Sequence, residues 1–286
     1  MDKNSVMKWC IACDRTQQHD IVFHKNKIPI LKCCGCGLGS ADASDFDPSS
    51  YYDKGYFSGD RVDGYEDYQA SEKVLRAEFQ RTLNAMRTMG VGSGALLELG
   101  CAYGYFLMEA RKYFDVYGIE ICEDAVETCR KNGLQNVRCG SGVDELGAVP
   151  QVDAVVMLDV IEHLKEPAVM MAEAVSKIRH DGILLMTTGD FSSMVSRVFV
   201  KRWRLMTPPQ HLWFFTPKAL ELMGNRLGLE LVSVEHPSKK VPLSLMLYQM
   251  CRPFNYQLKP HPFLGSIGLT INTFDAMRLI FRKNKV

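Results

Sequence analysis

Two pairs of cysteines near the N-terminus have the spacing of metal ligands. Cys10 and Cys13 form one C-x-x-C pair, and Cys33 and Cys36 form a second. Four thiolates at about 2.3 Å from one ion make a closed tetrahedral zinc site, and two intervening residues let a tight turn present both sulfurs of a pair. Cys34 falls out of this register. The sequence therefore predicts a structural zinc ion bound by Cys10, Cys13, Cys33 and Cys36.

The setting of these cysteines favours metal over disulfides. The chain starts with a short polar segment and has no apolar leader, which is typical of a cytoplasmic protein. In such a protein, paired cysteines bind metal more often than they form disulfides. A redox role is disfavoured because neither C-x-x-C pair opens an expected helix. A segment of about 35 residues buries little core, so the metal would supply its folding energy.

The turn within residues 96–106 has the pattern of a nucleotide-binding loop. The apolar strand LLELG ends at Gly100, and a helix begins near Gly104; neither glycine has a Cβ to keep a ligand away from the backbone. Glu120 ends the next strand, where a carboxylate can accept both hydroxyls of a ribose. An ordinary strand-to-helix turn is the alternative.

The spacing of the glycines distinguishes between two possible ligands, a dinucleotide and S-adenosylmethionine. A dinucleotide site carries G-x-G-x-x-G because a pyrophosphate lies on bare backbone at the helix N-terminus. Here Ala102 replaces the second glycine, Tyr103 follows it, and no third glycine precedes the helix. S-adenosylmethionine (SAM) has no phosphate, so the looser E-x-G-x-x-x-G turn from Glu98 is enough. The sequence favours SAM over a nicotinamide dinucleotide.

Two of the seven histidines occur where acid–base chemistry could act. His163 follows the fourth strand in DVIEHL, at the strand end where open α/β sheets bind ligands. His211 lies in the loop TPPQHLWFF after the fifth strand. Either could remove a proton from a hydroxyl or carbon acceptor, and Glu162 could orient either imidazole. A structural hydrogen bond for His163 and a packed loop position for His211 are the alternatives.

A basic run, KRWR, follows the fifth strand. Arg202 and Arg204 flank Trp203, and their guanidinium groups could clamp a phosphate or carboxylate of a substrate. A solvated surface is the alternative for the same run.

These residues require a framework of alternating strands and helices. Helical spacing predicts helices over 69–89 and 167–182 and further helices between the other strands. Strands that alternate with helices predict an α/β fold around a mostly parallel sheet. The seven expected strands lie near 95–100, 115–121, 135–141, 152–164, 182–189, 229–236 and 276–283, and the fourth runs into a loop.

Three regions are expected along the chain. Residues 1–45 form a zinc ribbon in which Asp20 to Cys33 folds as a β-hairpin. Residues 46–68 form a Tyr-rich connector, and 69–286 form the α/β domain with a helical insert at about 239–263. The insert could be a lid, a surface for a homodimer, or a helix on a membrane surface.

Composition narrows the range of partners. The formal net charge of the 286 residues is only +1, whereas proteins that bind long nucleic acids usually carry a basic excess. No window offers the roughly 20 apolar residues of a transmembrane helix. We expect a cytoplasmic protein with no transmembrane segment and no nucleic-acid partner.

The turn from Glu98 to Phe106, Glu120 and DVIEHL together resemble, in order, the motifs of class I SAM-dependent methyltransferases over about residues 70–286. The resemblance implies a Rossmann-like seven-stranded methyltransferase sheet whose last strand is antiparallel. Within it, Glu98, Gly100 and Gly104 would line the methionine end of SAM. Ser141 and Gly142 would flank the adenine, although the family often has an acidic residue where Ser141 stands, and Asp159 would lie beside the sulfonium. The full implied cofactor set is Glu98, Gly100, Cys101, Ala102, Gly104, Phe106, Glu120, Ile121, Ser141, Gly142 and Asp159.

The zinc ribbon followed by YYDKGYFSGDRVDGYEDY resembles one bacterial subgroup of these methyltransferases. That subgroup includes enzymes that methylate nucleotide-linked sugars and other small metabolites. The resemblance implies that Tyr52, Tyr56 and Tyr68 close over SAM or the acceptor; packing between domains is the alternative. It also implies methyl transfer to a hydroxyl or carbon of a small-molecule acceptor in bacterial polysaccharide or secondary metabolite biosynthesis.

Two other functions are compatible with the motifs. Some ribosomal RNA methyltransferases also resemble a zinc ribbon joined to a Rossmann-like domain, and the near-neutral charge disfavours this function. A non-catalytic SAM-binding or zinc-ribbon adaptor is disfavoured by the intact Glu98–Gly104 turn together with DVIEHL.

Overall fold

The computed structural model describes residues 5–43, 46, 51, 54–57, 67–141, 143–251 and 261–284. Contacts divide the chain into two units. Unit 1 comprises Met1–Pro48, Pro150–Pro237 and Thr273–Val286, and unit 2 comprises Ser49–Val149 and Ser238–Asn272. Tyr52 and Gly142 lie outside the described residues, as does the side chain of Tyr56.

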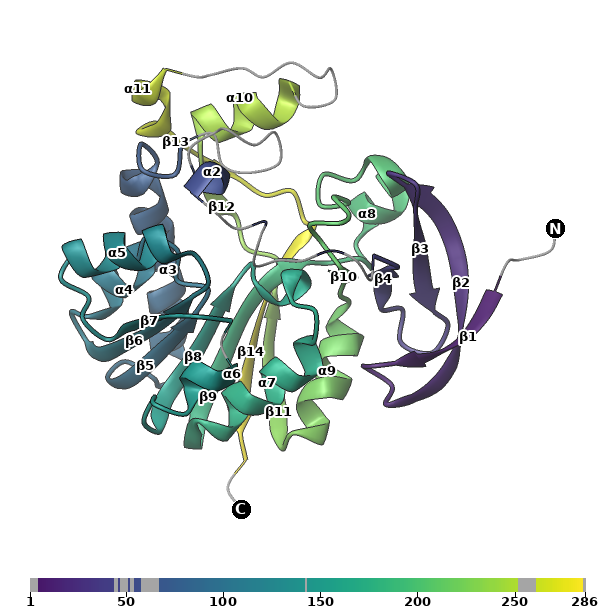
Figure 1. The fold of residues 1–286 in the computed structure, drawn as a ribbon, viewed down its shortest axis with the longest axis horizontal. Helices are drawn as coiled ribbons and strands as arrows, with labels where there is room; N and C mark the ends of the chain where they lie inside the picture. Colours follow the sequence, from purple (N-terminus) through teal and green to yellow (C-terminus); the bar gives the residue numbers. More distant parts are fainter. Residues whose placement is uncertain are drawn as a thin grey trace. The chain divides into compact units, whose positions relative to one another are not determined.

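A seven-stranded sheet has the strand order β11-β14-β9-β8-β5-β6-β7 (Figure 1). Its strands are β5 (Gly94–Leu99), β6 (Phe114–Glu120), β7 (Val137–Cys139), β8 (Val152–Leu158), β9 (Ile178–Gly189), β11 (Leu229–Glu235) and β14 (Ala276–Lys283). The pairs β5–β6, β6–β7 and β8–β9 are parallel, and β14 is antiparallel to both β9 and β11. The predicted α/β fold, its seven strands and its antiparallel last strand are confirmed.

In unit 2, three helices accompany strands β5 to β7. They are α3 (Glu72–Thr88), α4 (Tyr105–Ala110) and α5 (Glu123–Lys131). The helix predicted over 69–89 corresponds to α3, whose apolar stripe buries Val74, Leu83 and Met86. Gly133 follows α5 with a φ of 78°, a left-handed conformation that suits glycine at a helix end.

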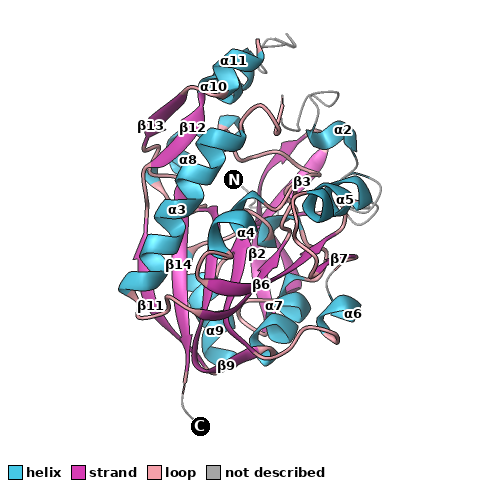
Figure 2. Ribbon diagram, turned by 90° about the vertical axis from the view of Figure 1, so that its left-hand side faces the viewer, coloured by secondary structure: helices cyan, strands magenta, loops and turns pink. Residues whose placement is uncertain are grey.

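The insert of unit 2 begins and ends with a strand. β12 (Lys239–Pro242) pairs with β13 (Gly268–Ile271) in antiparallel fashion. Helices α10 (Leu243–Cys251) and α11 (Pro262–Gly265) lie between them in the chain and next to them in space (Figure 2). The expected helix is present, whereas the pairing of β12 with β13 was not predicted, because two segments of four residues carry no readable period.

In unit 1, β8 is almost entirely buried, and β9 is buried from Gly182 to Thr188. Helix α7 (Pro167–Ser176) packs on β9, and α9 (Pro217–Arg226) packs on β11 and β14. The side chain of Thr216 caps α9 by accepting the N–H of Ala219 at 3.1 Å. The helix expected over 167–182 is too long, since it ends at Ser176 and β9 already begins at Ile178.

A second sheet of unit 1 contains the N-terminal strands in the order β1-β2-β3-β4-β10. Its strands are β1 (Ser5–Cys10), β2 (Arg15–Lys25), β3 (Ile28–Cys33), β4 (Gly39–Ala41) and β10 (Trp213–Phe214). The expected hairpin is confirmed: β2 and β3 join through Asn26 and Lys27, with φ of 51° and 65°, as a two-residue turn of right-twisted strands requires. The fifth strand, β10, comes from far along the chain and was not predicted.

None of the helices in the described part of the chain combines the length and the hydropathy needed to cross a membrane.

Candidate functional site

In unit 2, Glu120 links the glycine turn to the start of α5. Its side chain lies at the end of β6 and is 5% exposed. One carboxylate oxygen accepts the N–H of Ala102 at 2.8 Å, and the other accepts the N–H of Cys122 at 2.9 Å. Burial raises the pKa of Glu120, and backbone donors act in the opposite direction. A carboxylate has about four acceptor sites, so both oxygens can still accept a hydroxyl.

Glu98 has a buried carboxylate oxygen that no described group satisfies. The side chain is 3% exposed, and its Oε2 has no hydrogen-bond partner. Burial raises the pKa of Glu98 well above its usual value, and the nearby Cys129 and Glu120 add to the effect. A buried polar atom without a partner costs about 1–3 kcal/mol. A ligand with a cationic donor would satisfy this oxygen and lower the pKa again.

The turn between these carboxylates is built on left-handed residues. Gly100 has a φ of 72° and donates its N–H to Ile119 O at 2.8 Å. Gly104 has a φ of 77° and caps α4. A Cβ at Gly104 would lie 2.4 Å from Cδ1 of Leu134 and 2.9 Å from Sγ of Cys129. Protein atoms therefore fill the space that we had expected a ligand to approach, and packing accounts for the glycine there.

Aromatic rings cover the outer side of this turn within unit 2. Tyr68, which is 6% exposed, stacks on Tyr105 with ring centroids 5.3 Å apart. Its ring also packs edge-to-face with Tyr103 and with Phe57, at ring-centroid distances of 5.4 and 5.5 Å. Of the three connector tyrosines in the predicted site, Tyr68 thus packs directly against the nucleotide turn. This contact fits both its predicted role and the packing alternative.

The remaining residues of the predicted cofactor set in unit 2 differ in accessibility. Cys101 and Phe106 are buried, and Phe106 meets Phe79 edge-to-face at 5.8 Å. Ile121 is half-buried, and Ser141 is exposed. Phe106 is therefore a core residue that packs α4 against Phe79 of α3.

In unit 1, Asp159 follows β8 in a left-handed conformation with a φ of 55°, which is uncommon for a residue other than glycine. Thr187 of β9 holds it: the N–H of Asp159 donates to Thr187 O at 3.0 Å, and Thr187 Oγ1 donates to Asp159 Oδ1 at 2.9 Å. The side chain is exposed. Asp159 is thus fixed at the carboxyl end of β8.

The structure brings together the three residues predicted for acid–base chemistry. His163 ends the 3-10 helix η1 (Ile161–His163), directly after β8. A carboxylate oxygen of Glu162 and one ring nitrogen each of His163 and His211 lie within 4.8 Å of one another. The two imidazole rings meet edge-to-face with centroids 4.6 Å apart. We call these three residues the Glu-His-His cluster.

Hydrogen bonds fix the tautomer of both histidines. His163 Nδ1 lies 3.0 Å from Gln210 O, and His211 Nδ1 lies 2.8 Å from Leu205 O. A carbonyl oxygen only accepts, so each neutral ring carries its proton on Nδ1 and a lone pair on Nε2. Burial lowers the pKa of His163 to about 4. Burial and the neighbouring His163 lower the pKa of His211 well below its usual value. Both rings are therefore neutral near pH 7.

The loop that carries His211 is tied to η1 and to the N-terminal sheet. The N–H of Leu212 donates to Glu162 O at 2.9 Å, and Trp213 Nε1 donates to Leu164 O at 2.9 Å. On the other side, the N–H of Ala41 donates to Leu212 O at 2.8 Å, where β10 pairs with β4. The N-terminal sheet thus helps to position the Glu-His-His cluster.

The two arginines predicted to clamp a substrate differ in their partners. Arg204 pairs with the fully buried Asp275 through two bonds, Nε to Oδ2 at 3.0 Å and Nη2 to Oδ1 at 2.8 Å. Burial raises the pKa of Asp275, but Arg204, Thr273 and Trp203 outweigh it and lower the pKa. The Nε and Nη2 groups of Arg204 are therefore already bonded to the Asp275 carboxylate. Arg202 is exposed.

A histidine–carboxylate pair outside the predicted set lies beyond β9 and β11. Asp190 is 4% exposed, and its Oδ2 lies 2.9 Å from His236 Nε2. Its other oxygen accepts both the N–H and the hydroxyl of Ser192, at 2.7 and 2.6 Å. The position of Asp190 at the carboxyl end of β9 is the sequence signal that could have indicated it.

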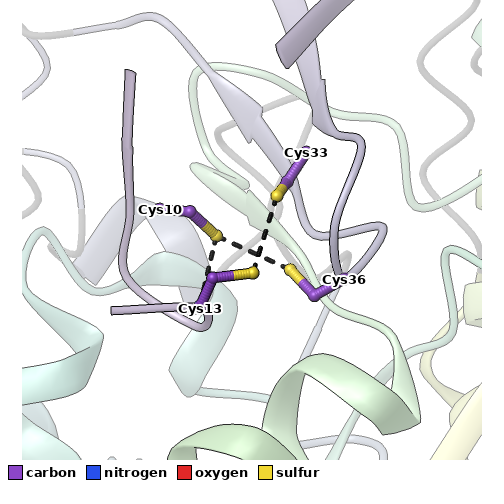
Figure 3. Close-up of side chains that lie close together, drawn as sticks. All are labelled: Cys10, Cys13, Cys33 and Cys36. Carbon is purple, nitrogen blue, oxygen red and sulfur yellow. Dashed lines mark hydrogen bonds between the residues drawn. The ribbon is translucent and has the colours of Figure 1, made fainter. Parts of the chain in front are cut away.

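The four paired cysteines converge in unit 1, and Figure 3 shows their sulfur atoms pointing toward one another. Sγ of Cys10 lies 3.5 Å from that of Cys36, and Sγ of Cys13 lies 3.8 Å from that of Cys33. Ligand atoms at 2.3 Å from a tetrahedral ion lie about 3.8 Å apart, so this spacing fits zinc. The exposed Cys34 does not belong to the group. We call the four residues the four-cysteine cluster.

Both turns of the four-cysteine cluster are fixed by the protein. Gly37, with a φ of 79°, donates its N–H to Cys33 O at 2.9 Å. At α9, Thr216 Oγ1 donates to Cys36 O at 3.0 Å, and Arg226 donates to Ala12 O. The helix that packs on β11 and β14 therefore also contacts both cysteine turns.

Comparison with known proteins identifies what the chain is similar to. A family model described as a methyltransferase domain matches residues 66–234, more than half of the chain. A SAM dependent methyltransferase from Archaeoglobus fulgidus is 18% identical over 74% of this chain and 94% of its own, with a TM-score of 0.52. The [4+2]-cyclase SpnF is 18% identical over 73% of this chain and 81% of its own, with a TM-score of 0.50.

These two structures are similar in fold alone. SpnF carries the name of a cyclase, so the fold by itself does not determine the reaction. No curated protein matches the chain.

Proposed function

The chain belongs to the methyltransferase-domain family, and we propose that this SAM-dependent enzyme methylates a hydroxyl or carbon of a small-molecule acceptor. The acceptor class that we propose is a saccharide, sugar nucleotide or natural-product intermediate. The observation that carries the SAM site is the buried, unsatisfied Oε2 of Glu98 beside the turn that Glu120 closes.

Unit 2 would hold the cofactor through the two carboxylates at the strand ends. The methionine ammonium of SAM would supply the donor and the positive charge that Glu98 lacks. The ribose hydroxyls would donate to the lone pairs that Glu120 keeps beside its two backbone bonds. Neither interaction involves a phosphate, which is consistent with Ala102 in the place of a second glycine. When bound, SAM supplies a methyl group that its sulfonium already activates.

The remaining cofactor residues would act in two ways. Gly100 and Gly104 shape the turn with left-handed backbone, and Phe106 belongs to the core. Ser141 and Gly142 would flank the adenine, and Asp159 would contact the sulfonium. Tyr68 would cover the cofactor from its stack on Tyr105.

The Glu-His-His cluster would handle the proton that the acceptor loses. Each imidazole holds a lone pair on Nε2 and is neutral near pH 7. A pKa of about 4 for His163 makes it a weak base, because general bases work best when their pKa lies near the working pH. The acceptor must therefore be acidic by nature or be made more acidic in the site.

We also propose that the four-cysteine cluster binds zinc as a structural ion. The S···S distances of 3.5 and 3.8 Å, the two C-x-x-C turns and the absence of a fifth cysteine in register support a closed tetrahedral site. The ribbon would contribute indirectly to catalysis, through the β4–β10 pairing that holds the His211 loop.

Calorimetric titration with SAM and with NAD tests the cofactor assignment. The wild-type protein is expected to bind SAM with micromolar affinity and to show no heat with NAD. Glu120→Ala and Glu98→Gln should each weaken SAM binding at least tenfold. The exposed Glu127 of α5 provides a matched control, and Glu127→Ala should bind SAM like the wild type. Unchanged SAM affinity in Glu120→Ala would refute the ribose assignment.

A further inference from the structure

The Glu-His-His cluster has the composition of a metal site that keeps an open position. Among the described residues, two groups place at least three metal-binding side chains together: the four-cysteine cluster and the Glu-His-His cluster. Two imidazoles and one carboxylate are a ligand set of catalytic zinc sites, in which a fourth position stays open for water or substrate.

The spacing of the donor atoms suits one ion. One donor atom each from Glu162, His163 and His211 lies within 4.8 Å of the other two. Nitrogen and oxygen ligands at about 2.1 Å from a tetrahedral ion lie roughly 3.4 Å apart. Small side-chain adjustments would therefore bring all three donors onto one cation.

The hydrogen bonds that both histidines make through Nδ1 also support a metal site. Metal-bound histidines almost always donate their second ring N–H to a carbonyl or carboxylate, which fixes the ring and directs the other nitrogen at the ion. Both histidines here do so, with Nδ1 at 3.0 Å from Gln210 O and 2.8 Å from Leu205 O. Both Nε2 atoms therefore carry the lone pair that a metal needs.

Two backbone hydrogen bonds and one from the Trp213 side chain keep the two halves of the cluster at a fixed separation. Leu212 N–H to Glu162 O, Trp213 Nε1 to Leu164 O and Ala41 N–H to Leu212 O join η1, the His211 loop and β4. Asp159 acts on both imidazoles as a negative charge, and Arg204 acts on His211 as a positive one. The Arg204 charge is in turn paired with Asp275. The charged groups that act on the two imidazoles therefore do not repel a bound cation.

We propose that Glu162, His163 and His211 bind one divalent cation of the zinc type, separate from the ion of the four-cysteine cluster. Mixed imidazole and carboxylate ligands favour borderline transition metals over Ca²⁺ and Mg²⁺. The open position accepts water or an oxygen of the acceptor. An acceptor hydroxyl bound there would release its proton to solvent water more readily than a free hydroxyl does. Its oxygen would then take the methyl group as the carbon–sulfur bond of SAM breaks, and the sulfur would leave as a neutral thioether. The ion would thus compensate for the weak basicity of the two imidazoles. Cation binding stands on the cluster alone, whereas this catalytic use rests on the proposed methyl transfer.

Metal content measured by mass spectrometry tests the site. Wild-type protein equilibrated with Zn²⁺ and freed of excess should hold about two ions per chain, and His211→Ala and Glu162→Gln should each hold about one. His180 is an exposed histidine of unit 1, so His180→Ala is the matched control and should hold about two. Equal zinc content in the wild type and both cluster variants would overturn the proposal.

Cobalt spectroscopy on the wild-type protein guards against variants that misfold. Co²⁺ at the four-cysteine cluster gives intense sulfur-to-metal absorption, and a second equivalent at the Glu-His-His cluster should add weaker visible bands without more sulfur absorption. Saturation after a single sulfur-bound equivalent would contradict the proposal. SAM calorimetry on the same samples separates the two hypotheses: a missing second ion with intact SAM binding refutes only the metal site, and loss of SAM binding by the wild type refutes the proposed function.

Discussion

The four-cysteine cluster and the Glu-His-His cluster lie in the same unit but differ in the number and type of ligands that they offer. Four thiols from two tight turns would saturate a tetrahedral ion, and three of the four cysteines are buried. Two imidazoles and one carboxylate from η1 and a loop leave one position open. On our proposal that both clusters bind metal, the first has the ligands of a structural site and the second those of a catalytic site.

The two clusters are also connected through one sheet. β3 ends at Cys33, its neighbour β4 pairs with β10, and β10 follows His211 by two residues. Loss of the first cluster should therefore disturb the second, whereas loss of the second should leave the first intact. This asymmetry can be tested by single substitutions.

The largest effect is expected from Cys33→Ser. The substitution removes a ligand from a segment that has little core of its own, so zinc should be lost and the protein destabilised by at least about 3 kcal/mol. Zinc content and thermal melting measure both effects. Cys34→Ser, at the exposed neighbouring cysteine, should leave both unchanged. Equal melting curves for the two variants would show that the predicted ligand Cys33 does not stabilise the protein.

His163→Ala and His211→Ala should impair chemistry without unfolding the chain. Each removes a group that acts on the acceptor, so methyl transfer should fall about 100-fold or more, while SAM affinity and the zinc of the four-cysteine cluster stay unchanged. Radiolabelled methyl transfer to a pool of candidate acceptors measures the first, and calorimetry the second. Full turnover in both variants would show that neither histidine contributes to the reaction.

Thr216→Val should loosen the attachment of the ribbon to α9. Thr216 Oγ1 donates to Cys36 O and accepts the N–H of Ala219 at the start of the helix. Loss of both bonds should cost about 1–2 kcal/mol, with zinc retained. Thr216→Ser keeps the hydroxyl and should melt within about 0.5 kcal/mol of the wild type. The free energy of urea unfolding distinguishes the two variants, and equal values would contradict the capping role.

The last prediction concerns Glu109 of unit 2, a buried carboxylate that Gln80, Lys112 and Arg76 hydrogen-bond. Burial raises its pKa, but hydrogen bonds from Gln80, Lys112 and Arg76 outweigh burial and lower the pKa to about 2. The unfolded state, with a pKa near 4.3, therefore binds more protons between these values. The stabilisation is complete above about pH 5 and is lost as the pH falls toward 2.

Glu109→Gln should accordingly lower the free energy of unfolding by about 2 kcal/mol at pH 7, and the difference from the wild type should vanish below about pH 2. Urea unfolding at a series of pH values measures it. Glu127→Gln, at an exposed carboxylate, is the control. Its free energy of unfolding should depend on pH in the same way as that of the wild type. A difference between Glu109→Gln and the wild type that does not change with pH would contradict the assigned pKa.

The sequence alone predicted those parts of the site that follow from local patterns. Each of these residues lies at or just beyond the end of an apolar strand, where open α/β sheets bind ligands: Glu98, Glu120, Glu162 and His163. The cysteine pairs were recognisable because two residues between ligands make one turn. Neither inference required knowledge of contacts between distant segments.

Contacts between distant segments explain what the sequence did not reveal. β10 has two residues and pairs with β4, far earlier in the chain. The partner of Arg204 is Asp275, 71 residues away. The tautomers of His163 and His211 depend on backbone carbonyls of the loop at 205–210. None of these partners leaves a period or a motif in the sequence, since each depends on the folded path of the backbone.

A crystal structure of the protein with S-adenosylhomocysteine tests the central claim most directly. The account predicts ribose hydroxyls within hydrogen-bond distance of the Glu120 carboxylate and the ammonium group beside Oε2 of Glu98. A nucleoside bound away from the turn between Glu98 and Glu120, with Oε2 of Glu98 still unsatisfied, would contradict it.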